Sequence, residues 1–129
     1  AGNTLTFRPG YRCWGVAFDG RDSALTLPTA DWPNRSHFTL AFWMNPAQVT
    51  DYATLWHDDT FWLYLEPASQ KLVWEGWQNG WQTVTSTLSA VTDTWQHVAT
   101  VYDGTSLQLY LDGALVGQKE VGGLSGDGD

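Results

Sequence analysis

The sequence predicts an all-β fold, an antiparallel β-sandwich, and three observations support this prediction. No helical period extends over a useful length of the chain. Short runs of alternating apolar and polar residues are separated by turn residues, a pattern typical of sandwiches and jelly rolls. Between Thr94 and Gly117, two Asp-Gly pairs divide three such runs, TWQHVATVY, TSLQLYL and ALVG. Asp-Gly favours tight hairpin turns, so this stretch predicts a three-stranded antiparallel meander.

The rest of the chain contains further alternating runs of strand length. No linker, internal repeat or change of composition divides them, so we expect one domain over residues 1–129. The expected strands, in chain order, are Thr4–Arg8, Trp14–Phe18, Ala24–Leu27, His37–Asn45, Ala53–His57, Phe61–Glu66, Lys71–Trp77, Gln82–Thr87, Trp95–Tyr102, Ser106–Leu111 and Ala114–Lys119.

Composition limits the partners that this chain can bind. The 129 residues carry a net charge of −8, which argues against nucleic acid and against an anionic membrane surface. No apolar run is long enough to insert into a membrane. A solvated acidic surface explains the charge most simply, although a neutral ligand or bound calcium would also suit it. Nine Trp, five Tyr and five Phe are more aromatic residues than a core of this size needs.

The meander also carries a family resemblance. Its pattern WxHVAxVYDGxxLxLYLDGxLVG resembles the signature of laminin-G-like jelly-roll domains of the concanavalin A-like lectin/glucanase superfamily. Two earlier segments extend the resemblance, GVAFDGRDSALTLP (Gly15–Pro28) and HFTLAFWMNP (His37–Pro46). The resemblance implies the sandwich fold, and it specifies function much less, because one fold hosts many activities.

The resemblance further implies a shortened C-terminus, because family members usually continue with strands that close the sandwich. We expect the N-terminal strand around Leu5–Phe7, or a neighbouring subunit, to fill the vacant edge. An open sheet edge is a site for strand addition, so a homo-oligomer joined through this edge is one expectation.

Two hairpins in the middle of the chain set the faces of a second sheet. A four-residue loop at Pro67–Gln70 places Trp62 opposite Glu75, and a two-residue Asn79-Gly80 turn places Glu75 opposite Val84. The expected core face comprises Phe61, Leu63, Leu65, Leu72, Trp74, Thr83 and Thr85, with Trp81 at its turn end. The other face comprises Trp62, Tyr64, Val73, Glu75, Trp77, Gln82 and Val84.

This second face mixes flat aromatic rings with hydrogen-bonding groups, which suits a sugar. We expect stacking on Trp62, Tyr64 and Trp77, with Glu75 and Gln82 as polar partners. Two alternatives stay open at this point. The face could pack under the other sheet, as one face of every sheet in a sandwich must, or it could form a protein–protein interface.

Acidic residues and the single cysteine are the remaining candidates. The resemblance implies that the loop containing Asp19 and Asp22 can help to hold calcium, but calcium needs six to eight oxygen ligands and two carboxylates are too few. The alternative is that both serve as turn residues. Cys13 lies in an apolar run, which predicts a buried free thiol.

The sequence therefore favours a non-catalytic binding or adhesion module that recognises a carbohydrate. The paired-carboxylate signature ExDxxE of the glycoside hydrolases that share this fold is absent. The alternative function is a structural subunit of a surface assembly, such as a virion decoration protein or an extracellular filament. Either function implies an extracellular or surface location, and no signal peptide is visible.

Overall fold

The chain forms ten β-strands, all paired antiparallel, in a computed structural model that describes residues 5–21, 23–27, 37–78 and 80–124. These described residues contain no helix, and so none that could span a membrane. The chain divides into two compact units, residues 1–33 and 34–129. The predicted all-β antiparallel architecture is confirmed.

The first unit contains a two-stranded hairpin. Strand β1 (Thr6–Pro9) pairs with β2 (Trp14–Ala17), with Phe7 opposite Val16. The Gly10 amide donates to the Cys13 carbonyl oxygen at 2.7 Å and closes the turn. Closing so short a loop costs little entropy, so the local hairpin prevails. Among the described residues β1 pairs with β2 and with no strand of the sandwich, so the filling of the sandwich edge stays a prediction. Cys13 is exposed in the turn rather than buried, which corrects the prediction of a buried thiol.

The run Ala24–Leu27 is not a strand, which corrects another expectation. Its alternation is real, but Leu25 and Leu27 are both exposed. A strand exists only where a neighbouring strand accepts and donates its backbone hydrogen bonds, and no described segment pairs with this one.

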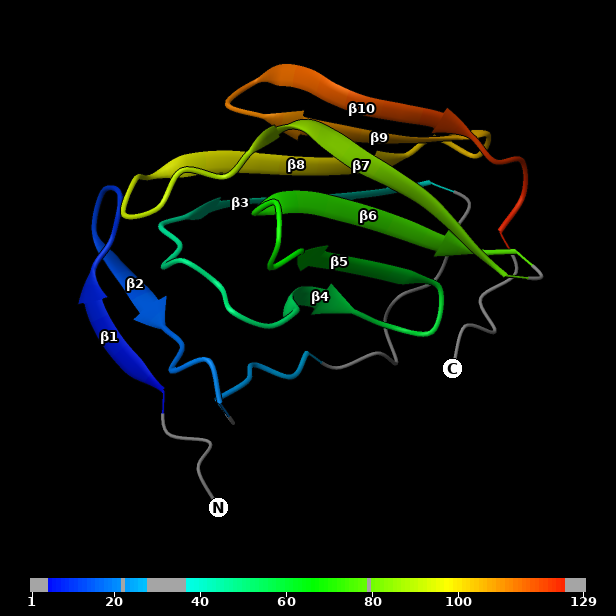
Figure 1. The fold of residues 1–129 in the computed structure, drawn as a ribbon. Helices are drawn as coiled ribbons and strands as arrows, with labels where there is room; N and C mark the ends of the chain where they lie inside the picture. Colours follow the sequence, from blue (N-terminus) through cyan, green and yellow to red (C-terminus); the bar gives the residue numbers. More distant parts are fainter. Residues whose placement is uncertain (1–4, 22, 28–36, 79, 125–129) are drawn as a thin grey trace. The chain divides into compact units, whose positions relative to one another are not determined.

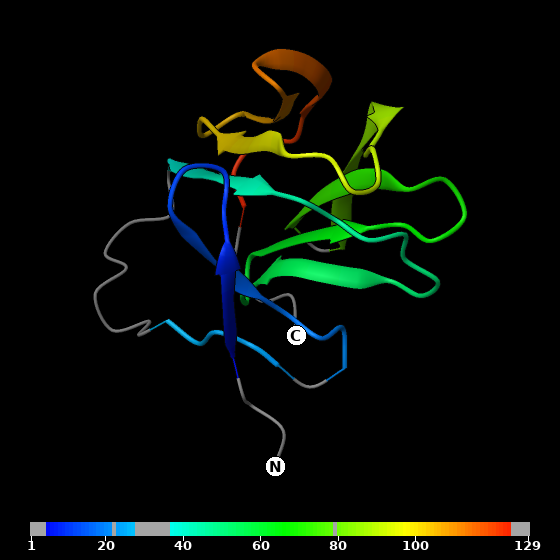
Figure 2. The ribbon, with the colours of Figure 1, turned by 90° about the vertical axis from the view of Figure 1, so that its left-hand side faces the viewer.

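The second unit is a sandwich of two four-stranded sheets, seen as two layers in Figures 1 and 2. One sheet has the order β10-β9-β8-β3, the other β4-β5-β6-β7. The strands are β3 (Phe38–Met44), β4 (Ala53–His57), β5 (Phe61–Leu65), β6 (Lys71–Trp77), β7 (Trp81–Ser89), β8 (Gln96–Tyr102), β9 (Ser106–Leu111) and β10 (Ala114–Glu120).

The core lies between these sheets and confirms most of the predicted core face. The Phe61 ring stacks on Trp74 with centroids 4.9 Å apart and on Phe38 of the facing sheet, also at 4.9 Å. The side chains of this core that are almost fully buried include Phe61, Leu63, Leu65, Leu72 and Trp74 on one sheet and Val98, Leu107, Leu109 and Leu111 on the other. The opposite face of β5 and β6, which carries Trp62 and Glu75, therefore points away from the core. The alternative that this face packs under the second sheet is wrong.

The predicted meander is β8-β9-β10, and its two turns are held differently. Asp112 and Gly113 both have positive φ, 51° and 81°, as a two-residue hairpin turn requires. At the other turn, the carboxylate of Asp103 accepts hydrogen bonds from the backbone amides of Thr105 (3.0 Å) and Ser106 (2.7 Å). These bonds lower the pKa of Asp103 from 3.8 to about 2.

Replacing Asp103 by alanine is expected to lower the melting temperature near neutral pH, because two backbone amides lose their acceptor. A depressed folded-state pKa stabilises the protein fully above the unfolded value of 3.8, and this contribution is lost as the pH falls through about 2. In thermal denaturation, the difference in melting temperature between wild type and Asp103→Ala should therefore shrink as the pH falls from 3.8 to about 2. Asp103→Asn retains one acceptor oxygen and should lie between them. A difference that stays constant down to pH 2 would contradict this role.

The segment after β10 caps one end of the core. The Tyr102 hydroxyl lies 2.9 Å from the Gly122 carbonyl oxygen and accepts the Leu124 amide at 3.2 Å. Leu124 then packs over Gly76 so closely that a Cβ at that position would lie 2.6 Å from a Leu124 methyl group. The inner side of β6 near its hairpin end is thus filled by the chain itself.

Candidate functional site

The outer face of the β4–β7 sheet is built on the β5–β6 register, which is as predicted. Trp62 lies opposite Glu75, and Tyr64 lies opposite Val73. The Glu66 amide donates to the Lys71 carbonyl oxygen at 2.9 Å, which closes the predicted four-residue loop. Loop length and the burial of alternate residues agree here, so the sequence defines the register uniquely.

The β6–β7 register differs from the prediction by one residue. Trp77 pairs with Trp81, so residues 78–80 connect the strands, and the Gln78 amide donates to the Gly80 carbonyl oxygen at 2.9 Å. Asn79 itself lies outside the described residues. The observed register buries Val84 and exposes Thr83 and Thr85, whereas the predicted register would bury two hydroxyls and expose a valine. Burial of the apolar side chain overrides the Asn-Gly turn signal.

This shift changes which residues belong to the outer face. Trp81 and Thr83, predicted on the core side, lie on the outer face opposite Trp77 and Glu75. Gln82 moves the other way, because it pairs with Gly76 and so shares the side of Trp74. The remaining predicted ligand residues, Trp62, Tyr64, Glu75 and Trp77, stay together on the outer face.

The rings of this face form one continuous series, which we call the aromatic row: Tyr52, Tyr64, Trp62, Trp81 and Trp77. Successive centroids along the row lie 5.5, 4.4, 6.2 and 5.4 Å apart. His57 on β4 adds a ring 6.0 Å from Trp62. Tyr52 is exposed, and the other four rings are half-buried. In Figure 1 these residues come from the green layer, β4 to β7, and from the loop before it.

Polar atoms at the ring edges are fixed by neighbouring side chains. The Trp62 indole N–H donates to Thr54 Oγ1 at 3.1 Å. The Tyr64 hydroxyl donates to Glu75 Oε1 at 3.0 Å. These bonds lie at the ring edges, so they restrict rotation of the rings.

Glu75 is the buried centre of this arrangement, with 7% of its surface exposed. Its Oε1 accepts from Tyr64 and also from Thr83 Oγ1, at 3.0 Å. Burial, the Glu75 charge and their hydrogen bond together raise the pKa of Tyr64 well above its usual value. The tyrosine therefore remains a neutral donor at physiological pH. Glu75 acts chiefly by holding Tyr64 and Thr83 in position.

Asp19 serves as a turn residue in the structure. Its Oδ1 accepts the backbone amides of Arg21 (2.9 Å) and Ser23 (3.2 Å) and the Ser23 hydroxyl (2.8 Å). Asp22 lies outside the described residues. Within the described ranges no three His, Cys, Asp or Glu side chains gather as metal ligands. The calcium prediction stays a prediction.

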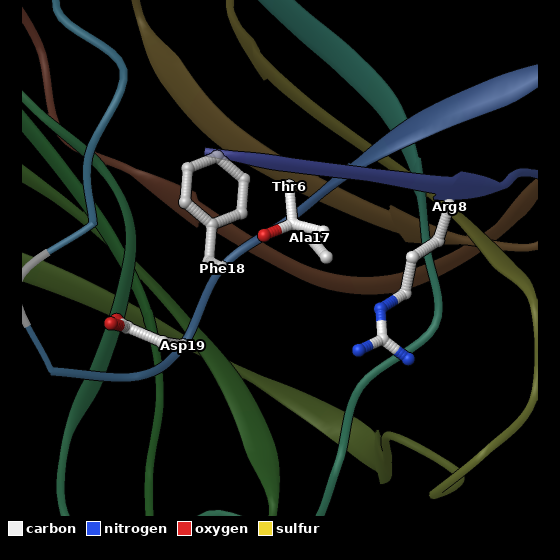
Figure 3. A pocket seen from close by; sticks show the side chains of 5 residues that line it. All are labelled: Thr6, Arg8, Ala17, Phe18 and Asp19. Carbon is white, nitrogen blue, oxygen red and sulfur yellow. The ribbon is translucent and has the colours of Figure 1, made fainter. Parts of the chain in front are cut away.

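A small open cavity of about 190 Å³ lies on the first unit, lined by Thr6, Arg8, Ala17, Phe18 and Asp19. Figure 3 shows the Arg8 guanidinium and the Asp19 carboxylate on opposite sides of Thr6 and Ala17, so the charged groups do not converge. Typical ligand pockets are larger, about 300–1,000 Å³. We therefore place the candidate site on the aromatic row.

Comparison with known families supports the fold. A laminin G family model, described as the concanavalin A-like lectin/glucanases superfamily, matches residues 19–129. No curated protein matches the sequence. The match includes every strand of the sandwich, whereas the hairpin β1–β2 precedes it. The chain therefore belongs to the concanavalin A-like lectin/glucanases superfamily.

Proposed function

We propose that this chain is a non-catalytic binding module that recognises carbohydrate through the aromatic row. Pyranose rings present apolar C–H patches that pack against aromatic faces, and their hydroxyls need hydrogen-bonding partners. The observation that carries the proposal is the row itself, five rings on the outer face of one sheet with two of them fixed by edge hydrogen bonds. Thr54 and Thr83 supply hydroxyls beside the rings.

The carboxylates near the row support binding rather than glycoside hydrolysis. Hydrolysis requires two carboxyl groups flanking the scissile bond. Along the paired positions that carry the rings of β5, β6 and β7, the structure describes one carboxylate, Glu75. Because Glu75 is almost fully buried and holds Tyr64 and Thr83, it is poorly placed as a general acid or nucleophile.

A glycan array tests the proposal, with Trp62→Ala as the principal variant. Loss of the ring should weaken binding at least about tenfold, because burial of one aromatic side chain contributes about 1.5–3 kcal/mol. Trp43→Ala is the matched control, since Trp43 is 44% exposed on β3 of the other sheet. It should leave binding unchanged. The site assignment is wrong if no glycan binds, or if Trp62→Ala binds as well as Trp43→Ala.

A second candidate function, a structural subunit of a surface assembly, is favoured by the hairpin β1–β2. Phe7, Pro9, Trp14 and Val16 share one of its faces, and all four are exposed. A two-stranded hairpin is marginal alone, and an apolar face of this kind is typical of contact surfaces. Light scattering at low concentration distinguishes the candidates: a stable assembly that Trp14→Lys dissociates supports this one, and a monomer contradicts it.

Both candidates place the protein where glycans or partner subunits are displayed. We therefore propose an extracellular location, or one on the surface of a cell or virion. The negative net charge of −8 favours neutral partners over nucleic acid in either case.

A further inference from the structure

We infer that the aromatic row takes a single, neutral glycan chain of several sugar units, and not the surface of a crystalline polysaccharide or an anionic glycan. This inference rests on the proposed function and narrows its ligand class. Three features of the row carry it: the inclination of its rings, its length and the sign of its charges.

The rings of the row are inclined to one another. The interplanar angles of successive pairs are 70°, 42°, 59° and 74°. By contrast, the core rings of Phe61 and Trp74 lie within 6° of parallel. A flat crystalline surface contacts several rings at once only if the rings share a plane. Inclined rings instead suit a chain that can rotate at each glycosidic bond and present a new sugar face at each step.

The Trp77–Trp81 pair shows this geometry at the hairpin end of the row. The two rings meet at 74° with centroids 5.4 Å apart, so one forms a floor and the other a wall. Such a corner contacts one sugar ring on its face and at its edge. A planar polymer sheet would reach only the more prominent of the two rings.

The row is also long enough to contact more than one sugar. It begins at Tyr52, before β4, crosses β5 at Tyr64 and Trp62, and ends at Trp77 and Trp81 beside the β6–β7 turn. Every link of this series is a ring–ring contact of 4.4 to 6.2 Å. A monosaccharide would leave part of the row uncovered, so affinity should increase with chain length.

The charge of the chain disfavours anionic glycans. The row is built around the carboxyl group of Glu75, which accepts hydrogen bonds from Tyr64 and Thr83. Lys71 begins β6 beside Glu66 and shares the outer face with Glu75, so it offsets one of the nearby negative charges. With a net charge of −8 on the whole chain, a sulfated or carboxylated glycan would be repelled during approach and at the site.

Titration calorimetry with soluble gluco-, manno- and xylo-oligosaccharides, from disaccharide to hexasaccharide, tests the inference. At least one neutral series should gain about tenfold or more in affinity with length, which corresponds to about 1.4 kcal/mol. Trp77→Ala should remove most of this gain, because it shortens the row at its hairpin end. Trp43→Ala should reproduce the wild-type length dependence. Pull-down on crystalline cellulose and on chitin, and titration with heparin, should show no binding.

The outcomes separate the two levels of the proposal. If no soluble, crystalline or anionic glycan binds, the proposed function is wrong and this inference falls with it. If crystalline polymer or heparin binds and Trp62→Ala abolishes that binding, the proposed function stands and the ligand class is wrong. An affinity that is independent of chain length also overturns the inference, because one sugar would then satisfy the site.

Discussion

Replacing Phe61 by alanine is expected to lower the free energy of unfolding by about 3–5 kcal/mol. Phe61 is fully buried, and its ring stacks on both Trp74 and Phe38, so it joins the two sheets. Removing it leaves a cavity bounded by two rigid aromatic rings that cannot easily close it. Because small domains have only about 5–15 kcal/mol of stability, this single change should bring the sandwich close to unfolding.

Urea denaturation followed by circular dichroism measures this loss. Phe7→Ala is the matched control, since the same side chain is 66% exposed on the β1–β2 hairpin. Its effect should stay within about 0.5 kcal/mol. Equal losses in the two variants would mean that Phe61 does not hold the core together.

Replacing Glu75 by alanine is expected to disorder the aromatic row and to destabilise the fold by about 1–3 kcal/mol, because partly buried hydroxyls lose their acceptor. Tyr64 and Thr83 both donate to Glu75 Oε1. With Tyr64 free to rotate, its contact with the Trp62 ring, now 4.4 Å between centroids, is no longer fixed. Affinity for any bound glycan should therefore fall together with stability.

Glu75→Gln separates the hydrogen bonds from the charge. Its amide oxygen can still accept from Tyr64 and Thr83, so most of the stability should return. The pKa of Tyr64 should decrease toward its usual value without reaching it, because burial, the larger cause of its shift, remains. Alkaline titration of phenolate absorbance measures this change, with Tyr64→Phe identifying the signal. If the Tyr64 pKa does not change in Glu75→Gln, the carboxylate does not act on this hydroxyl.

Most of the sandwich could be predicted because local turn chemistry and alternation agreed. The β9–β10 hairpin is an example. It is indicated both by the Asp112-Gly113 turn and by the alternation of Leu107, Leu109 and Leu111. The loop between Glu66 and Lys71 likewise sets the β5–β6 register without ambiguity. Where the turn and the alternation agree, shifting the strand register by one residue would turn every apolar side chain of the strand outward. The sequence therefore excludes the shifted register.

The site was only partly predictable because two signals conflict at the β6–β7 turn. Asn79-Gly80 favours a two-residue turn, whereas burial of Val84 requires a register one residue away. A two-residue turn predicts Gln82 on the ligand face and Trp81 at the turn end of the core face. Burial of Val84 in place of Thr83 and Thr85 predicts the opposite arrangement, with Trp81 on the outer face and Gln82 on the core side, as the structure shows. The burial of Glu75 could not be anticipated, because alternation places it on the face opposite the core.

Strand β3 has a consequence for handling this protein. It is seven residues long, FTLAFWM, without a charge or a proline, and in its sheet its one described neighbour is β8. Thr39, Ala41 and Trp43 on its outward side are exposed. Natural sheets usually protect such edges with charged residues or bulges, since unprotected ones recruit further strands into aggregates. Ala41→Lys places a charge on this strand and away from the aromatic row, so it should reduce aggregation at high concentration.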